Sequence, residues 1–151
     1  MAALLLLLCV FSCVRFACAG EEAKSPDKPG ALPGYHPAGM AMWDAWHIDH
    51  DGKAHMRYLQ RHINGAVRSK IEEDSLGHAV ASDLLRWTER PLALAPGPAG
   101  ALDDMQPWTG SLVKHEGLFY LFYTMRNKAD NGARQRIGLA TSRDLDHWER
   151  H

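Results

Sequence analysis

Apolar and polar positions form the same pattern twice along the chain, each time in a way typical of strands joined by a tight turn. In the first copy, residues 47–50 run into Asp51-Gly52 and are followed by residues 56–59. The second copy has the same three parts, at residues 112–115, at Glu116-Gly117 and at residues 119–123. An acidic residue followed by Gly, placed between two short apolar-rich runs, predicts a hairpin. The pattern therefore predicts two pairs of antiparallel strands.

The segment that follows each predicted hairpin is also written twice. The sequences L-G-H-A-V-A-S-D-L-L-R-W (residues 76–87) and I-G-L-A-T-S-R-D-L-D-H-W (residues 137–148) share Gly, Ala, Asp-Leu and Trp at corresponding places. In each copy the Asp favours a turn, and the Trp suits packing against a sheet. Upstream, Trp43 corresponds to Trp108. Two copies of a unit of about sixty residues indicate an array of supersecondary units.

The number of strands in each unit points to the fold class. Asn131-Gly132 predicts a further hairpin that leads into a strand at residues 136–142. Residues 119–123 are apolar or aromatic at successive positions, which indicates that both faces of this strand are covered. The Asp-Leu-x-x-Trp turn leads into a short outer strand, which gives each unit four strands. Four strands in a repeated unit predict an all-β protein built of β-propeller blades. The alternative is an ordinary β-sandwich in which the similarity of the two units arose by chance.

The first nineteen residues are typical of a signal peptide. The apolar run from Leu4 to Val14 is too short to span a bilayer, and Ala17-Cys18-Ala19 offers a cleavage site before Gly20. We rank export to the periplasm or the exterior above anchoring as a lipoprotein through Cys13 or Cys18. The chain then divides into three parts: a signal peptide at residues 1–19, a flexible leader at 20–38 and the propeller part at 39–151.

Charge and cysteine content narrow the function classes further. The chain has 17 Lys and Arg against 18 Asp and Glu, which gives no basic excess for nucleic acid. After the signal segment no second apolar run predicts a membrane span. All three cysteines lie within residues 1–19, so the exported chain would hold no disulfide. These features leave an exported protein with a large apolar core, and they leave its oligomeric state open.

Several short motifs carry a resemblance to a known family. They are Trp43-Asp44, Tyr58-Leu59-Gln60, the segment 77–87, and Trp108-Thr109-Gly110-Ser111 preceded by Asp103-Asp104. Together they resemble the five-bladed β-propeller glycoside hydrolases of families 32, 43, 62 and 68, most closely family 32. The resemblance implies five blades, of which this chain supplies about two.

The same resemblance implies a function. The full-length protein would hydrolyse fructosides or arabinosides, whereas this portion alone would be inactive. The alternative is a non-catalytic carbohydrate-binding protein or a degenerate propeller fragment.

The resemblance also implies a catalytic residue, Asp44. In family 32 an Asp at the start of the first blade is the nucleophile, and a carboxylate suits that task because it can attack or stabilise an oxocarbenium-like carbon. The family pattern W-x-N-D-P-N-G is replaced here by M-W-D-A-W-H. Nucleophile and water-activating base therefore both stay open, as does a structural role for Asp44 as a turn acid.

A further set of residues is predicted to contact the sugar. Gln60 matches a family Gln that hydrogen-bonds the furanose, and His78 is either a subsite residue or a buried structural histidine. The full set of predicted substrate contacts is Gln60, Trp46, Trp108, Ser111, His78 and Asp104. Asp104 would lie at the pocket rim or, alternatively, in a solvated loop.

The histidines do not predict a metal site. His47 and His50 fall on opposite faces of one predicted strand, so they cannot converge with His55 by local geometry. We therefore expect no metal or other cofactor, and a carbohydrate as the binding partner.

Overall fold

The computed structural model describes residues 34–63 and 74–151. The predicted signal peptide and residues 20–33 of the predicted leader lie outside them. The described residues form two four-stranded antiparallel sheets, each with its strands in chain order. The first sheet consists of β1 (Met40–His50), β2 (Lys53–His62), β3 (Ser75–Ala81) and β4 (Thr88–Glu89). The second consists of β5 (Gln106–His115), β6 (Leu118–Arg126), β7 (Arg136–Ser142) and β8 (Glu149–Arg150).

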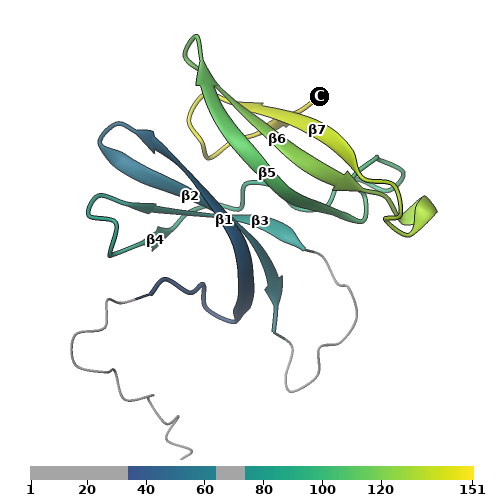
Figure 1. Ribbon diagram of the computed structural model, residues 1–151, viewed down its shortest axis with the longest axis horizontal. Helices are drawn as coiled ribbons and strands as arrows, with labels where there is room; N and C mark the ends of the chain where they lie inside the picture. Colours follow the sequence, from purple (N-terminus) through teal and green to yellow (C-terminus); the bar gives the residue numbers. More distant parts are fainter. Residues whose placement is uncertain (1–33, 64–73) are drawn as a thin grey trace, which may run out of the picture. The chain divides into compact units, whose positions relative to one another are not determined.

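The all-β prediction is confirmed. The only helix among the described residues is the single 3₁₀ turn η1 (Lys128–Asp130), which sits in the predicted hairpin between β6 and β7. No helix in this part of the chain is long and apolar enough to cross a membrane. Figure 1 shows the first sheet in blue and teal and the second in green and yellow. Each sheet has the form of a propeller blade, and the total of five blades stays a prediction.

The internal repeat is present in the backbone as well as in the sequence. The two hairpin turns use the same left-handed pair, with φ of 49° and 70° at Asp51 and Gly52 and of 47° and 79° at Glu116 and Gly117. Leu84 and Leu145, in the repeated Asp-Leu-x-x-Trp segments, both have positive φ, at 61° and 68°. Positive φ is uncommon for a leucine, so its occurrence at matching places shows that the two segments follow one backbone course.

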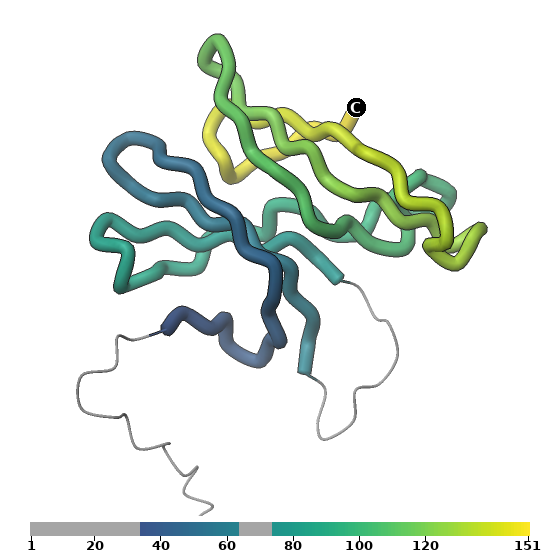
Figure 2. The backbone as a smooth tube through the Cα atoms, in the orientation of Figure 1, coloured from purple at the N-terminus to yellow at the C-terminus, as the bar shows by residue number. Residues whose placement is uncertain are grey.

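Each sheet also contains a β-bulge at the same point of its first strand. The pairing of β1 with β2 shifts between Trp43 and Ala45, and that of β5 with β6 shifts between Trp108 and Gly110. The extra residue is Asp44 in the first sheet and Thr109 in the second. A bulge bends its strand and redirects the side chain of the extra residue. β1 and β5 contact each other, and Figure 2 shows their paths side by side.

The main core lies between the two sheets. Leu59 and Leu76 of the first sheet pack with Leu121 and Tyr123 of the second, and all four are at most 2% exposed. Burial of each such side chain contributes roughly 1.5–3 kcal/mol relative to exposure. This packing fixes the position of one sheet against the other, and therefore of one bulge against the other.

The opposite face of the first sheet is covered by two aromatic residues of the chain itself. Tyr58 is fully buried beneath Tyr35 and Trp87, with ring centroids of Tyr35 and Tyr58 5.6 Å apart. Gly77 lies directly across from Tyr58, and a Cβ at position 77 would come within 2.2 Å of the Tyr58 ring. A glycine is therefore required for the tyrosine to lie flat on the sheet.

The prediction that both faces of the strand at 119–123 are covered is wrong for the described residues. In β6, Phe119 and Leu121 are fully buried against the first sheet, whereas Phe122 on the other face is 41% exposed. β2 shows the double coverage instead, because Tyr35 and Trp87 cover its second face. An apolar run shows which side chains could be buried. Whether they are buried depends on residues elsewhere in the chain that pack on them.

Candidate functional site

Asp44 is placed by the bulge in β1. As the extra residue of that bulge it has a left-handed φ of 42°, and its side chain is exposed. A non-glycine residue in this conformation is uncommon, and short polar side chains such as Asp tolerate it best. The strand therefore presents a carboxylate to solvent at a position where a regular strand would not direct it.

Thr109, the extra residue of the bulge in β5, holds this carboxylate. Its hydroxyl Oγ1 donates a hydrogen bond of 2.6 Å to Oδ2 of Asp44. Among the described residues, no group donates a hydrogen bond to the second carboxylate oxygen, Oδ1. Sequence reasoning missed Thr109 as a functional residue. The signal was present, because aligning Trp43 with Trp108 places Asp44 on Thr109.

An aromatic and charged cluster lies beside this pair. The guanidinium of Arg61 lies 5.4 Å from the centre of the Trp43 ring and donates from Nε to Asp74 Oδ1 at 2.5 Å. Asp74 is fully buried. Its hydrogen bond raises the pKa of Arg61, so the guanidinium stays charged. The arrangement fixes Trp43, the residue that precedes Asp44.

Trp108 takes part in the same cluster from the second sheet. Its indole Nε1 donates to Asp74 Oδ2 at 3.1 Å, and the guanidinium of Arg126 lies 4.1 Å from its ring centre. With its amide oxygen turned toward them, Gln106 accepts from Trp108 Nε1 and from Arg126 Nη1, both at 2.6 Å. The buried carboxylate of Asp74 thus connects the tryptophans that precede the two bulges. Trp108 bonds Asp74 directly, and Trp43 is connected to it through Arg61.

Gln60 lies in β2 directly across from Met42 and is 4% exposed. Its Nε2 lies within 3.4 Å of Ser75 Oγ, and its Oε1 is buried with no hydrogen-bond partner among the described residues. A buried amide oxygen without a partner is costly, so this atom is suited to accept a hydrogen bond from a hydroxyl.

The predicted walls Trp46 and Ser111 differ in their surroundings. Trp46 packs against the core between the sheets, and its Nε1 is buried without a partner in the described part of the chain. Ser111 is exposed on β5, across from Phe122. Neither has a hydrogen bond to Asp44 or Thr109 within residues 34–63 and 74–151.

His78 lies on the face of β3 that meets the second sheet and is fully buried. Its partners are His55, 3.0 Å away between ring nitrogens, and Asp146, whose Oδ1 lies 3.2 Å from His78 Nδ1. Burial, with the charge of Arg57, lowers the pKa of His78 to about 3. It is therefore a neutral imidazole at the interface between the sheets.

Asp104 is engaged by backbone N–H groups of its own loop and of the connection between β6 and β7. Its two oxygens accept hydrogen bonds from Lys128 N at 2.7 Å and from Gly100 N at 3.0 Å, and these bonds lower its pKa. The neighbouring Asp103 accepts from Tyr123 Oη and from Arg150 Nε, both at 2.9 Å. Both carboxylates are committed to holding loops and strands in place.

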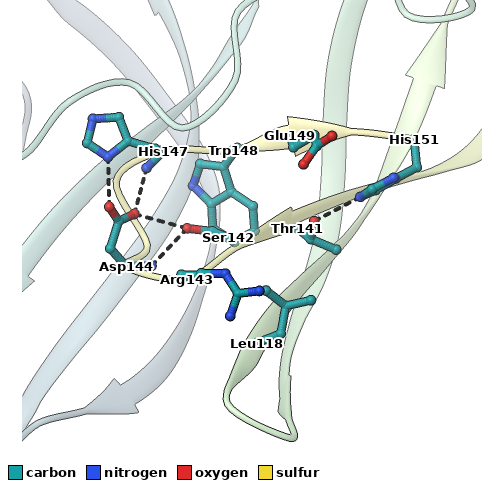
Figure 3. A pocket seen from close by; sticks show the side chains of 9 residues that line it. All are labelled: Leu118, Thr141, Ser142, Arg143, Asp144, His147, Trp148, Glu149 and His151. Atoms are coloured by element: carbon teal, nitrogen blue, oxygen red, sulfur yellow. Dashed lines mark hydrogen bonds and ion pairs between the residues drawn. The ribbon is translucent and has the colours of Figure 1, made fainter.

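The structure also contains a pocket of about 590 Å³ at the turn between β7 and β8 (Figure 3). It is lined by Leu118, Thr141, Ser142, Arg143, Asp144, His147, Trp148, Glu149 and His151, so it lies apart from Asp44. Asp144 accepts from Ser142 Oγ at 3.1 Å and lies 2.7 Å from His147 Nδ1. Asp144 contacts both Ser142 and His147, so the histidine does not lie between the serine and the acid. The three residues therefore do not form a nucleophile–base–acid triad.

Across residues 34–63 and 74–151, no group of three or more His, Cys, Asp or Glu side chains could hold a metal ion. The candidate site consists of the exposed carboxylate of Asp44, the hydroxyl of Thr109 and the aromatic rings beside them.

Comparison with known proteins agrees with this architecture. A family model described as "Glycosyl hydrolases family 32 N-terminal domain" matches residues 46–151. Sucrose-6-phosphate hydrolase of Escherichia coli is 37% identical over 79 residues, which cover 49% of this chain and 16% of that protein. The chain thus spans about one sixth of the length of the curated relatives it matches.

Solved structures extend the similarity in fold. A family 117 glycoside hydrolase from Zobellia galactanivorans superposes with a TM-score of 0.65 at 18% identity, covering 79% of this chain and 41% of that one. Fructan 1-exohydrolase IIa from Cichorium intybus superposes with a TM-score of 0.61 at 23% identity, covering 78% and 22%. These similarities show that the two sheets have the fold of β-propeller blades.

Proposed function

Because the chain belongs to glycoside hydrolase family 32, we propose that its protein hydrolyses the glycosidic bond of a furanoside, with Asp44 as one of the two reacting carboxyl groups. Fructofuranosides are the proposed substrate class, since the related proteins include a sucrose-6-phosphate hydrolase and a fructan exohydrolase. Arabinofuranosides are the alternative. The observation that carries the proposal is the exposed carboxylate of Asp44, set on a bulge and hydrogen-bonded by Thr109.

The geometry suits a carboxylate that acts on a sugar carbon. Thr109 fixes Oδ2 of Asp44 and so directs Oδ1 outward. Such pre-orientation matters because misplacement by about 1 Å can cost on the order of 100-fold in rate. Trp43 is held by Arg61 and Trp108 by Arg126, so both indoles can present a fixed apolar wall to a sugar ring. Gln60 Oε1 is available for a hydroxyl.

Glycoside hydrolysis needs a second carboxyl group that protonates the leaving oxygen. Asp103 and Asp104 do not fit this role, because Tyr123 and Arg150 both bond Oδ2 of Asp103, and backbone N–H groups bond both oxygens of Asp104. The separation between Asp44 and the acid will decide its function. About 5–5.5 Å would make Asp44 a nucleophile with retention, and about 6.5–9.5 Å a base with inversion.

The test is Asp44→Asn in the protein that carries this chain, with sucrose and a β-fructan as substrates. Loss of the carboxylate should lower kcat roughly 1,000-fold or more. The matched control is Asp49→Asn, since Asp49 is an exposed carboxylate on the same strand. Equal activity of Asp44→Asn and Asp49→Asn would exclude Asp44 from the reaction.

The same experiment separates hydrolysis from binding alone. If the unchanged protein binds a fructan in calorimetry but releases no sugar, a non-catalytic carbohydrate-binding function replaces the proposal. Release of sugar from an arabinofuranoside and not from sucrose would instead change the substrate class and leave the role of Asp44 standing.

We further propose that the protein is exported, with residues 1–19 as its signal peptide. The predicted leader at residues 20–38 is too long at its end, because Tyr35 packs on Tyr58 and Pro37 is fully buried. The support for export is the short apolar run followed by Ala17-Cys18-Ala19. N-terminal sequencing of the protein from a cell envelope or medium should begin at Gly20. A lipid-modified cysteine at the N-terminus would favour the anchored alternative, and an intact Met1 would contradict both.

A further inference from the structure

A group of basic side chains is buried where the first sheet meets the second. Arg57 and His78 lie directly across from each other on β2 and β3, and both are fully buried. His55 lies on the same face of β2, and its ring stacks on that of His78 with centroids 5.3 Å apart. Basic residues are seldom buried without a carboxylate, so an acidic side chain is expected close to this group.

The group is connected to the second sheet through Asp146, in the turn between β7 and β8. Asp146 Oδ1 lies 3.2 Å from His78 Nδ1, and Arg90 donates to both oxygens of Asp146. Arg57 reaches the same turn, because its Nη2 donates to the carbonyl of Leu145 at 2.6 Å. The contact from His55 through His78 to Asp146 therefore spans the interface between the sheets.

The proton arrangement of this contact is restricted. Only 3.0 Å separates His55 Nδ1 from His78 Nε2, so one of these nitrogens must carry the hydrogen and the other must accept it. His78 Nδ1 makes no hydrogen bond among the described residues, although Asp146 Oδ1 lies 3.2 Å from it. With a single hydrogen between the two facing nitrogens, both rings can be neutral. If both rings were protonated, two N–H groups would face each other at this distance. The geometry therefore excludes the doubly charged state.

The surrounding charges also disfavour protonation of His55 and His78. His78 faces Arg57, Arg90 and His55 as positive or titratable groups, against the single carboxylate of Asp146. His55 faces His50 and Lys53 in addition. The hydrogen bond and charge of Arg90 hold the pKa of Asp146 below its usual value although burial opposes this, so the carboxylate stays ionised. The single carboxylate of Asp146 thus faces several positive groups. Adding a positive charge by protonating His78 or His55 is therefore unfavourable.

We propose that His55, His78 and Asp146 form a proton-sensitive latch between the two sheets, which holds while both imidazoles are neutral, so that acid lowers the stability of the fold. The second sheet supports this assignment, because Leu139, which has no titratable group, stands there at the position that corresponds to His78. The latch is independent of the proposed function of Asp44.

The direction of the effect follows from the pKa values. Burial, followed by the charge of Arg57, lowers the pKa of both His78 and His55, and that of His78 to about 3. A base with a lowered folded-state pKa contributes fully above the pKa of the unfolded chain, about 6.5, and loses that contribution as the pH falls. At pH 5 a histidine kept neutral would lower the folding equilibrium constant about 30-fold.

The first test is the pH dependence of thermal unfolding of the chain between pH 8 and pH 5. We expect the Tm of the unchanged chain to fall in this range, and that of His78→Leu to fall much less. The matched control is His115→Gln, an exposed histidine of the second sheet, which should retain the full fall. Parallel curves for the unchanged chain and His78→Leu would overturn the latch.

A second measurement does not depend on a variant that folds. Nitrogen chemical shifts of the imidazoles in the unchanged chain report the protonation of each ring directly. His78 should remain neutral at pH 5 while the fold is intact. Protonation of His78 near pH 6.5 without unfolding would overturn the proposal.

Discussion

At the bulge of its first strand the first sheet carries Asp44, and sixty-five positions later the second sheet carries Thr109 at the same bulge. The backbones around these two residues match, from the hairpin turns to the left-handed leucines of the Asp-Leu-x-x-Trp segments. The side chains differ in kind, and they meet in one hydrogen bond. The comparison teaches that the repeated unit is a scaffold and that its chemistry lies where the two copies diverge.

A second divergence supports this reading. The arginine that stacks on the bulge tryptophan is common to both sheets, as Arg61 on Trp43 and Arg126 on Trp108. Its partner differs, since Arg61 bonds a buried carboxylate and Arg126 bonds the neutral Gln106 and the carbonyl of Gly132. The extra acid, Asp74, also receives the indole N–H of Trp108 and so joins the two copies.

Exchanging the bulge residues should give the largest effect. In the protein that carries this chain, the double variant Asp44→Thr with Thr109→Asp keeps both groups but moves the carboxylate to the other sheet. We expect kcat to fall roughly 1,000-fold, because the carboxylate would no longer lie where the substrate carbon is held. Substrate turnover at saturation measures this. Activity within tenfold of the unchanged protein would show that the two bulges are interchangeable.

Removing only the hydrogen bond should have a smaller effect. Thr109→Val deletes the donor to Asp44 and keeps the shape of the side chain, so kcat should fall about 10- to 100-fold with KM little changed. Thr109→Ser restores the hydroxyl and should recover most of the activity. A loss that serine does not rescue would make Thr109 a packing residue.

The residues after the bulges, Ala45 and Gly110, test how closely the two backbones match. A Cβ at position 110 would lie 2.1 Å from the carbonyl oxygen of Phe122, so Gly110→Ala should destabilise the chain by about 2–3 kcal/mol. The reciprocal Ala45→Gly should cost only about 0.5–1 kcal/mol. Chemical denaturation compares them, and equal costs would mean that the bulges have the same geometry.

The buried tyrosines give a smaller contrast. Tyr123→Phe leaves Asp103 without the hydroxyl that donates to it and should cost about 1–2 kcal/mol. Tyr58→Phe removes a bond to the part-exposed Tyr35, whose hydroxyl can turn to water, and should cost about 0.5–1 kcal/mol. Denaturation midpoints should differ in this order, and the reverse order would contradict the assignment of Asp103.

The exposed pairs at the two Asp-Leu-x-x-Trp turns should give the smallest effect. His147 bonds Asp144 where Arg86 bonds Asp83. The bond with Asp144 raises the pKa of His147, so its contribution is present at low pH and is lost as the pH rises through that raised value. His147→Gln should therefore lower the Tm slightly at pH 6 and leave it unchanged at pH 8.5, whereas Arg86→Gln should act equally at both.

The sheets could be predicted because their signals are local. The acidic-Gly turns and the Asp-Leu-x-x-Trp segments act through their own backbone bonds, as when Asp83 Oδ1 accepts from the N–H groups of Leu85 and Arg86. The exposed face of β6 could not be predicted from its apolar run. The cover of each face depends on distant residues such as Tyr35, which no periodicity reveals.

The candidate site was predicted in part for the same reason. Asp44 follows from its motif, but its hydrogen bond with Thr109 depends on two bulges that face each other across separate sheets. Asp74 was missed because it follows residues 64–73, where the two copies cannot be aligned. Its role appears only when Arg61 and Trp108 are seen to share it.

The carbonyl oxygen of Leu145 receives both Arg57 from the first sheet and the indole of Trp148. Because a main-chain atom accepts both bonds, the contact does not depend on which side chain stands at position 145, only on the left-handed course of the turn. This contact between the sheets can therefore be kept when the sequence of the turn changes. A chimaera that takes its second blade from a distant relative should dock on this first blade wherever that turn is preserved.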